Sequence, residues 1–308
     1  MRFKKKLVAF GVAAVALLLG GCGSMGAQQI AKEQNGGGTQ TTQQQNQQPV
    51  NNNHQRNHSF GLTGGSSSGQ LRQPADKFIM STITPNVKKQ LTAGGAKLSY
   101  NSRGAINIIG GPQLNTKVSS APYVQLPHRN PQHGNRLEGS ARAWLNHSSR
   151  QYQNRQATGN GRGSFKPVGF VQRMNLNPGM SGLTHLYDRG HLIAYAIAGN
   201  VRGFDASESN PNNIVTQTAW ANEARGAGTA GTGQNYYEGI VRQKLDQNDQ
   251  IMYQVTPIYD SPRDIIPRGI HLQAANKYEQ LFNVYVPNAQ NGVEIDYHTG
   301  HSKIVGTN

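Results

Sequence analysis

Residues 187–192, YDRGHL, lie at the start of LYDRGHLIAYAIAGNVRGFDASESNPNNIVTQTAWAN (186–222), the stretch that decides the fold. If this segment is extended, alternation puts Arg189 and His191 on one face, and Asp188 and Gly190 on the other. Arginine offers a planar fork that matches phosphate oxygens, and histidine is partly free to take a proton at neutral pH. Gly190 allows the backbone to turn or a phosphate to approach closely. The pattern predicts one face that binds an anion and moves a proton.

The remainder of the stretch predicts a turn followed by a helix. Residues 210–213 are turn formers, and residues 214–218 lead into a helix bearing Ala219, Trp220 and Asn222. We interpret Trp220 as a core residue rather than a substrate contact.

The charge of the chain limits its partners. Of a formal net charge of +15, residues 1–21 contribute +4 and residues 22–75 contribute +2, which leaves +9 on residues 76–308. A basic domain outside the cytoplasm attracts nucleic acid, anionic lipid or anionic wall polymer. The only cysteine is Cys22, which excludes an intrachain disulfide and a cysteine-ligated zinc site.

The N-terminus predicts export and anchoring. Residues 1–21 combine a cationic start with an apolar run, 7–19, that is short for a membrane span, as in a signal peptide. LGGC, 19–22, has the form of a lipobox, so we expect cleavage before Cys22 and a lipid on its sulfur. The alternative is an ordinary signal peptide with a chance cysteine. Residues 22–75 are rich in Gln, Asn, Gly and Ser, and predict a disordered tether of roughly 40 Å root-mean-square span.

Residues 76–308 are predicted to form one domain of mixed elements. We expect a short helix at 87–91, a turn at 94–95, a strand at 98–100 and an amphipathic helix at 234–246. Helical spacing of Ala143, Trp144 and His147 predicts a helix over 141–152 that leads into a basic loop. Alternation at 251–255 and 293–297 predicts half-buried antiparallel strands. We interpret His271 and His298, in or beside such strands, as structural.

Five ordered motifs carry a family resemblance. They are RQYQNRQATGNG (150–161), YDRGHLIAYA (187–196), GFDASESNPNNI (203–214), QTAWANEA (217–224) and GTGQNYYEGIVRQKLDQN (231–248). Over roughly residues 84–300 the chain resembles the DNA/RNA non-specific endonucleases with a ββα-metal, or His-Me finger, site. The resemblance implies an α+β fold with a central antiparallel sheet flanked by helices, His191 on a hairpin and Asn222 on the finger's helix.

The resemblance also implies a mechanism and a set of site residues. His191, beside Arg189, is expected to deprotonate water, and Asn222 to hold Mg²⁺, with Mn²⁺ as the alternative. One neutral oxygen suffices, because Mg²⁺ keeps most of its waters. Asn213 and Glu238 match supporting positions; their alternatives are a turn cap and a surface helix residue.

Basic residues before the central stretch are expected to grip substrate. In the family's membrane-bound DNA-entry nucleases a basic pair in the matching loop binds DNA; Arg155 matches its first member, and Gln156 stands at the second. Arg162 and Lys166 are further candidates, with a solvated charge as the alternative for each. The expected partners are DNA or RNA and, through the lipid, the outer face of the cell membrane; no nucleotide cofactor is expected.

Two other functions fit parts of the sequence. A non-catalytic DNA receptor shares the tether and the basic surface, but has no need of His191 together with Asn222. A zinc hydrolase needs a dense ligand set, and none of the ten histidines forms an HExxH motif.

Overall fold

A computed structural model describes residues 71–118, 120–161, 163, 165–177, 182, 184–226 and 231–306. All of them belong to the unit formed by residues 57–308. The predicted signal peptide, Cys22 and nearly all of the predicted tether lie outside the described residues, as does Arg162. Within the described part of the chain, no helix has the length and apolar character needed to cross a membrane.

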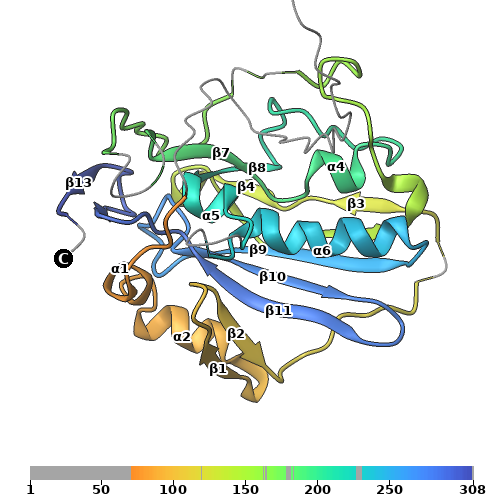
Figure 1. The fold of residues 1–308 in the computed structure, drawn as a ribbon, viewed down its shortest axis with the longest axis horizontal. Coiled ribbons are helices and arrows are strands. Elements are labelled where there is room, and N and C mark those ends of the chain that lie inside the picture. The colour runs from red at the N-terminus through yellow and green to blue at the C-terminus, as the bar shows by residue number, and fades with distance from the viewer. Residues whose placement is uncertain are drawn as a thin grey trace, which may run out of the picture. The chain divides into compact units, whose positions relative to one another are not determined.

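A seven-stranded sheet organises the domain (Figure 1). All of its paired strands are antiparallel, in the order β1-β2-β11-β10-β9-β6-β3. The expected central antiparallel sheet is therefore confirmed. Its strands are β1 (Lys97–Tyr100), β2 (Ile106–Ile109), β3 (Tyr123–Gln125), β6 (Ala141–Leu145), β9 (Ile251–Ile258), β10 (Gly269–Ala275) and β11 (Gln280–Pro287).

Helix α6 (Gln234–Asp246) covers one face of this sheet (Figure 1). Tyr237, Val241 and Leu245 recur at four-residue spacing and are buried in the main core. The alternating residues of the central strands meet them from the sheet: Ile251, Tyr253, Val255, Ile270, Leu272, Ala274, Phe282, Val284 and Val286. The predicted helix over 234–246 and the alternation of strand 251–255 are both confirmed.

The opposite side of the sheet is more polar. On it, His271 Nε2 bonds to Asn283 Oδ1 at 2.6 Å, and Gln254 Nε2 donates to Gln273 Oε1 at 3.0 Å. Burial lowers the pKa of His271, and the hydrogen bond to Asn283 raises it in part. This fits the structural interpretation of His271.

The predicted helix over residues 141–152 is wrong. Residues 141–145 form β6, which lies between β9 and β3, and Ala141, Ala143 and Leu145 enter the main core while Arg142 is exposed. The two-residue alternation of a strand therefore prevails over the helical spacing, because each edge of the segment pairs with a neighbouring strand. A single 3₁₀ turn, η3 (His147–Ser149), follows before the loop.

The N-terminal elements pack on the β1–β2 end of the sheet. Helix α2 (Pro85–Leu91) begins with proline at its first turn, and Thr84 Oγ1 accepts from Val87 N at 3.1 Å as its N-cap. Val87 and Leu91 then bury against Ile106 and neighbouring residues of β2. The predicted helix, turn and strand here are confirmed; the other elements are α1 (Asp76–Met80) and η1 (Ala93–Gly95).

The β4–β5 hairpin forms a separate two-stranded sheet whose Leu137 packs in the main core, and polar contacts also stabilise it. It comprises β4 (His128–Asn130), η2 (Pro131–His133) and β5 (Arg136–Glu138). Glu138 accepts hydrogen bonds from Asn130 at 2.8 Å and Arg136 at 2.8 Å, and its carboxylate pairs with His133 at 2.5 Å. Burial alone would raise the pKa of Glu138, but these bonds outweigh it and lower the pKa to about 2.

The C-terminal strands belong to a third hydrophobic cluster. β12 (Val293–Ile295) pairs with β13 (Ser302–Ile304), and Val293 and Tyr297 pack with Tyr187. The side chain of His298 pairs with the buried Asp264 at 2.6 Å. This contact agrees with a structural role for His298.

Candidate active site

A second, two-stranded sheet carries the central stretch of the sequence. β7 (Tyr187–His191) pairs antiparallel with β8 (Ile214–Thr218), with His191 opposite Ile214, and α5 (Ala219–Glu223) follows β8 directly (Figure 1). Thr218 ends the strand and caps the helix, because its Oγ1 accepts from Ala221 N at 3.2 Å. The predicted hairpin with its helix is confirmed, and Trp220 is a fully buried core residue. A short helix, α4 (Tyr195–Ala198), lies between the two strands in sequence.

Gly190 is needed for packing within this hairpin. Its backbone is extended, and a Cβ built there would lie 2.1 Å from Oε1 of Gln217 and 2.6 Å from its Cβ. Of the two sequence-based alternatives for Gly190, a turn or the close approach of a phosphate, the turn is not observed. Glycine is required because Gln217, two residues along β8 from the position opposite Gly190, packs over it.

His191 and Glu238 are in direct contact. Nε2 of His191 lies 3.0 and 3.1 Å from the two carboxylate oxygens of Glu238. Glu238 is 2% exposed, so the alternative of a surface helix residue is wrong. A carboxylate only accepts, which assigns the proton to Nε2 and leaves Nδ1 with the lone pair. Nδ1 is buried and has no hydrogen-bond partner among the described residues.

Gln234 fixes both members of this pair, and the sequence analysis missed it. It is fully buried, and its Nε2 donates to Glu238 Oε1 at 2.8 Å and to the main-chain oxygen of His191 at 2.8 Å. Gln234 and Glu238 stand four residues apart on the same stripe of α6 that carries the apolar core residues. Two polar residues on a buried helix stripe are the signal that could have identified the pair.

Asn222 approaches the hairpin from α5. The residue is 7% exposed, and its Nδ2 donates to Asp188 Oδ2 at 3.0 Å, which fixes the orientation of the amide. Its Oδ1 is buried and has no partner in the described part of the chain. Such an oxygen costs about 1–3 kcal/mol if nothing binds it. A neutral amide oxygen is a ligand that Mg²⁺ accepts, so the residues present fit the cation that the sequence analysis expects.

Asp188 also lies close to two other titratable side chains, those of His185 and Glu223. His185 Nε2 pairs with Asp188 Oδ1 at 2.8 Å, and this bond raises the pKa of His185. Burial and the charge of Asp188 raise the pKa of Glu223, on α5, to about 8. The carboxylates of the buried Asp188 and the half-buried Glu223 repel each other, which favours a proton or a cation between them.

Asn213 acts as a clamp at the end of the hairpin. It is 1% exposed; its Oδ1 accepts from Ile193 N at 2.9 Å, and its Nδ2 donates to Ile193 O at 3.0 Å. Both ends of the amide are thus used to hold the chain just beyond His191. Asn213 supports the site through the backbone.

The basic residues that were expected to bind substrate differ in the contacts that their side chains make within the protein. Arg189 Nε donates to Phe165 O at 2.8 Å, and the Arg155 guanidinium donates to Ala206 O at 2.5 Å and lies 4.6 Å from the Tyr195 ring centroid. Burial lowers the pKa of Arg155, while the charge of Glu208 raises it in part. Lys166 is exposed. Of these three residues, Lys166 is the one without such contacts to the described part of the chain.

Arg242 is a further cation that the sequence analysis missed. It stands four residues after Glu238 on α6 and is half-buried, and its guanidinium donates to Asn235 Oδ1 at 3.2 Å. Burial lowers its pKa, and the charge of Glu238 raises it in part. The four-residue spacing from Glu238 is the sequence signal for it.

The chain is similar to one protein family and to solved structures of a nuclease. The family model described as DNA/RNA non-specific endonuclease matches residues 76–295. NucA from Streptococcus agalactiae with magnesium bound is 36% identical, with a TM-score of 0.63, over 73% of this chain and 99% of NucA. The metal-free form of NucA is 36% identical, with a TM-score of 0.60, over 72% of this chain and 97% of that one.

Proposed function

Because the chain belongs to the DNA/RNA non-specific endonuclease family, we propose that it cleaves DNA without sequence preference, with His191 as general base and a divalent cation at Asn222. RNA is a second candidate substrate. The contact between His191 Nε2 and the buried Glu238 carboxylate carries the proposal, because it leaves Nδ1 as the basic nitrogen.

Proton transfer follows from this arrangement. Nδ1 of His191 takes a proton from a water molecule, whose oxygen attacks phosphorus while the bond from phosphorus to the leaving oxygen breaks. The ring is then an imidazolium, and Glu238 stabilises it through the Nε2–H bond. Gln234 keeps the carboxylate aligned on the ring.

Asn222 Oδ1 would hold the cation. Its amide is already oriented by Asp188, so binding requires no rotation of the side chain. When bound, a divalent ion neutralises charge on the phosphate and on the leaving oxygen. Mg²⁺ is favoured by the single neutral ligand, and the related NucA carries a magnesium ion in one of its crystal structures.

Substrate contacts are assigned to cations that suit phosphate. Arg189, Lys166 and Arg155 are supported by their place on or beside the hairpin, and Arg162 by sequence alone. Guanidinium and ammonium groups contact the backbone of nucleic acid, which carries no sequence information. We therefore propose that cleavage is broad in sequence.

We also propose that the mature protein is a lipoprotein anchored at Cys22 on the outer face of the cell membrane. The LGGC sequence and the apolar run before it support this. Cys22→Ala should release the protein or leave it as an unlipidated precursor, measured by fractionating washed membranes. Equal retention of both forms after a salt wash would contradict the anchor.

Digestion of supercoiled plasmid tests the proposed activity. The purified protein should nick and degrade unrelated plasmids in Mg²⁺, stop in EDTA and resume when Mg²⁺ is restored. Binding without cleavage under all these conditions would identify a DNA receptor instead. Cleavage that continues in EDTA would overturn the role of the cation.

A further inference from the structure

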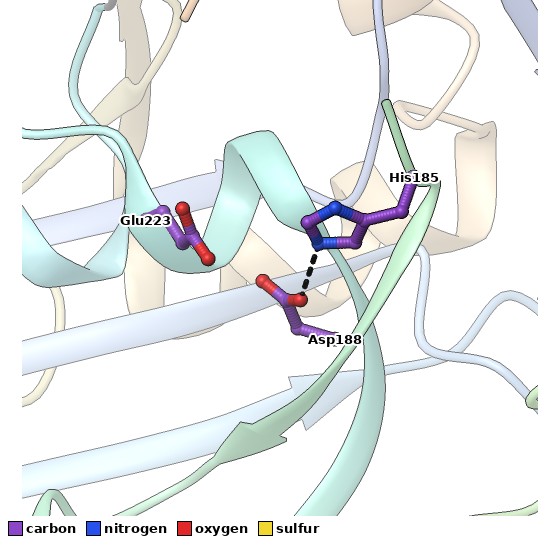
Figure 2. A group of neighbouring side chains, drawn as sticks. All are labelled: His185, Asp188 and Glu223. Carbon is purple, nitrogen blue, oxygen red and sulfur yellow. Dashed lines mark hydrogen bonds and ion pairs between the residues drawn. The ribbon is translucent and has the colours of Figure 1, made fainter. Parts of the chain in front are cut away.

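Three potential metal ligands converge beside Asn222. His185, just before β7, Asp188 on β7 and Glu223 at the end of α5 point toward one another (Figure 2). One ligand atom from each lies within 4.8 Å of the others, and His185 Nε2 lies 2.8 Å from Asp188 Oδ1. The mechanism above uses none of these three side chains as a reacting group.

Burial and charge make this group unusual. Asp188 is 3% exposed, the His185 side chain is 18% exposed, and Glu223 is half-buried. Two carboxylates therefore share a poorly hydrated space with one imidazole. The Asn222 side chain adjoins the same space through its bond to Asp188, and its buried Oδ1 has no partner among the described residues. Both observations indicate a place where positive charge is favoured.

The distances between the ligand atoms of the three side chains suit an ion with tetrahedral coordination. Zinc lies about 2.1 Å from imidazole nitrogen and carboxylate oxygen, which puts tetrahedral ligand atoms about 3.4 Å apart. The His185–Asp188 separation of 2.8 Å is below that value and all three separations are at most 4.8 Å, so small side-chain movements suffice. Asp188 can bind through Oδ1, because Oδ2 is the atom that holds Asn222.

The ligand types select among ions. Mg²⁺ prefers oxygen ligands in octahedral geometry and gives up its waters reluctantly. An imidazole nitrogen with two carboxylates instead suits zinc and neighbouring transition metals. We propose that His185, Asp188 and Glu223 form a second cation site, separate from the Mg²⁺ ligand Asn222, that binds a zinc-class divalent ion.

The two sites share Asp188 and are therefore coupled. A divalent charge bound beside Asn222 repels a second one on its amide oxygen, so zinc lowers the affinity for Mg²⁺, and Mg²⁺ lowers the affinity for zinc by the same factor. This coupling rests on the proposed function. The binding of zinc does not.

Calorimetric titration of the mature protein, from Cys22 onward, with zinc alone tests the site. The wild type should bind one zinc ion here, and His185→Gln and Glu223→Gln should each weaken that binding by about ten-fold or more, since losing even an outer-shell partner costs that much. His128→Gln, which changes an exposed histidine on β4, is the matched control and should bind as the wild type does. Thermal melts establish that each variant is folded, and Glu223→Gln keeps the test valid if His185→Gln unfolds.

Asn222→Ala separates this proposal from the proposed function. That variant should lose Mg²⁺-dependent cleavage, whereas its zinc binding, although weakened by the loss of the bond to Asp188, should remain measurable and should still depend on His185. Unchanged zinc affinity in both folded cluster variants would overturn the second site. An inactive wild type that still shows zinc binding dependent on His185 would leave the second site standing and refute the nuclease mechanism.

Discussion

Replacing Glu238 by glutamine perturbs the site while keeping its shape. The carboxylate now accepts from both His191 Nε2 and Gln234 Nε2. In glutamine one of the two carboxylate oxygens becomes an NH₂ group, so His191 Nε2, which lies 3.0 and 3.1 Å from the two oxygens, faces another donor at one of these positions. The pair can relax if His191 moves its proton to Nδ1, and that tautomer cannot take a proton from water.

The expected loss follows from the role of the base. General-base catalysis contributes about 10²–10⁴-fold, which corresponds to about 2.7–5.5 kcal/mol of barrier. We expect kcat to fall within that range at saturating Mg²⁺. Leaving a buried donor unpaired also costs about 1–3 kcal/mol of stability, so the variant must be assayed well below its melting temperature.

The assay is initial-rate cleavage of a labelled duplex at several Mg²⁺ concentrations. Glu279→Gln is the matched control, because that carboxylate is 57% exposed and its ion pair is with Lys244. If excess Mg²⁺ restores the full rate of Glu238→Gln, then Glu238 acts on the hydrated cation and the tautomer argument is refuted.

Three further predictions concern packing, pH and substrate binding. Gly190→Ala should lower the free energy of unfolding by about 1–3 kcal/mol because its Cβ overlaps Gln217. Gly239→Ala, whose Cβ would meet only the Arg242 side chain at 3.4 Å, should raise the free energy of unfolding by about 0.5–1 kcal/mol. Equal midpoints of urea denaturation for the two variants would contradict this. Because the pKa of Glu138 falls from 4.5 to about 2 on folding, its contribution is complete above pH 4.5 and is lost as the pH falls toward 2. Glu138→Gln should thus cost about 1 kcal/mol at pH 7 and little near pH 2, by urea denaturation at each pH. Arg155→Ala should weaken binding about equally on unrelated duplexes and reduce the slope of log affinity against log salt by roughly 0.9, and a loss confined to one sequence would argue against a phosphate contact.

The elements of the active site could be predicted because their patterns are local. The resemblance implies that His191 lies on a hairpin, and the apolar stripe of α6 predicts a helix. Residues 141–145 show the limit of this reasoning. The segment is so short that Ala143 and Trp144 also fit a helical period. The segment is a strand because it pairs with β9 on one edge and β3 on the other. Strand β10 was expected only through His271, which was placed in or beside a strand without bounds for that strand.

Contacts between distant residues could not be predicted from spacing. His191 and Glu238 are 47 residues apart, and Asp188 and Asn222 are 34 apart, so only the packing of α6 and α5 on the hairpin brings them together. The resemblance gave Glu238 a supporting place near the cation. Its contact with the His191 ring, and the part played by Gln234, required the structure.

The role of His191 as base is the central claim, and chemical rescue measures it most directly. His191→Gly should bind DNA with the wild-type affinity and lose most of its cleavage rate, by about 10²–10⁴-fold. Added imidazole should then raise the rate in proportion to its concentration and have no such effect on Asn222→Ala. Full activity of folded His191→Gly without imidazole would contradict the account.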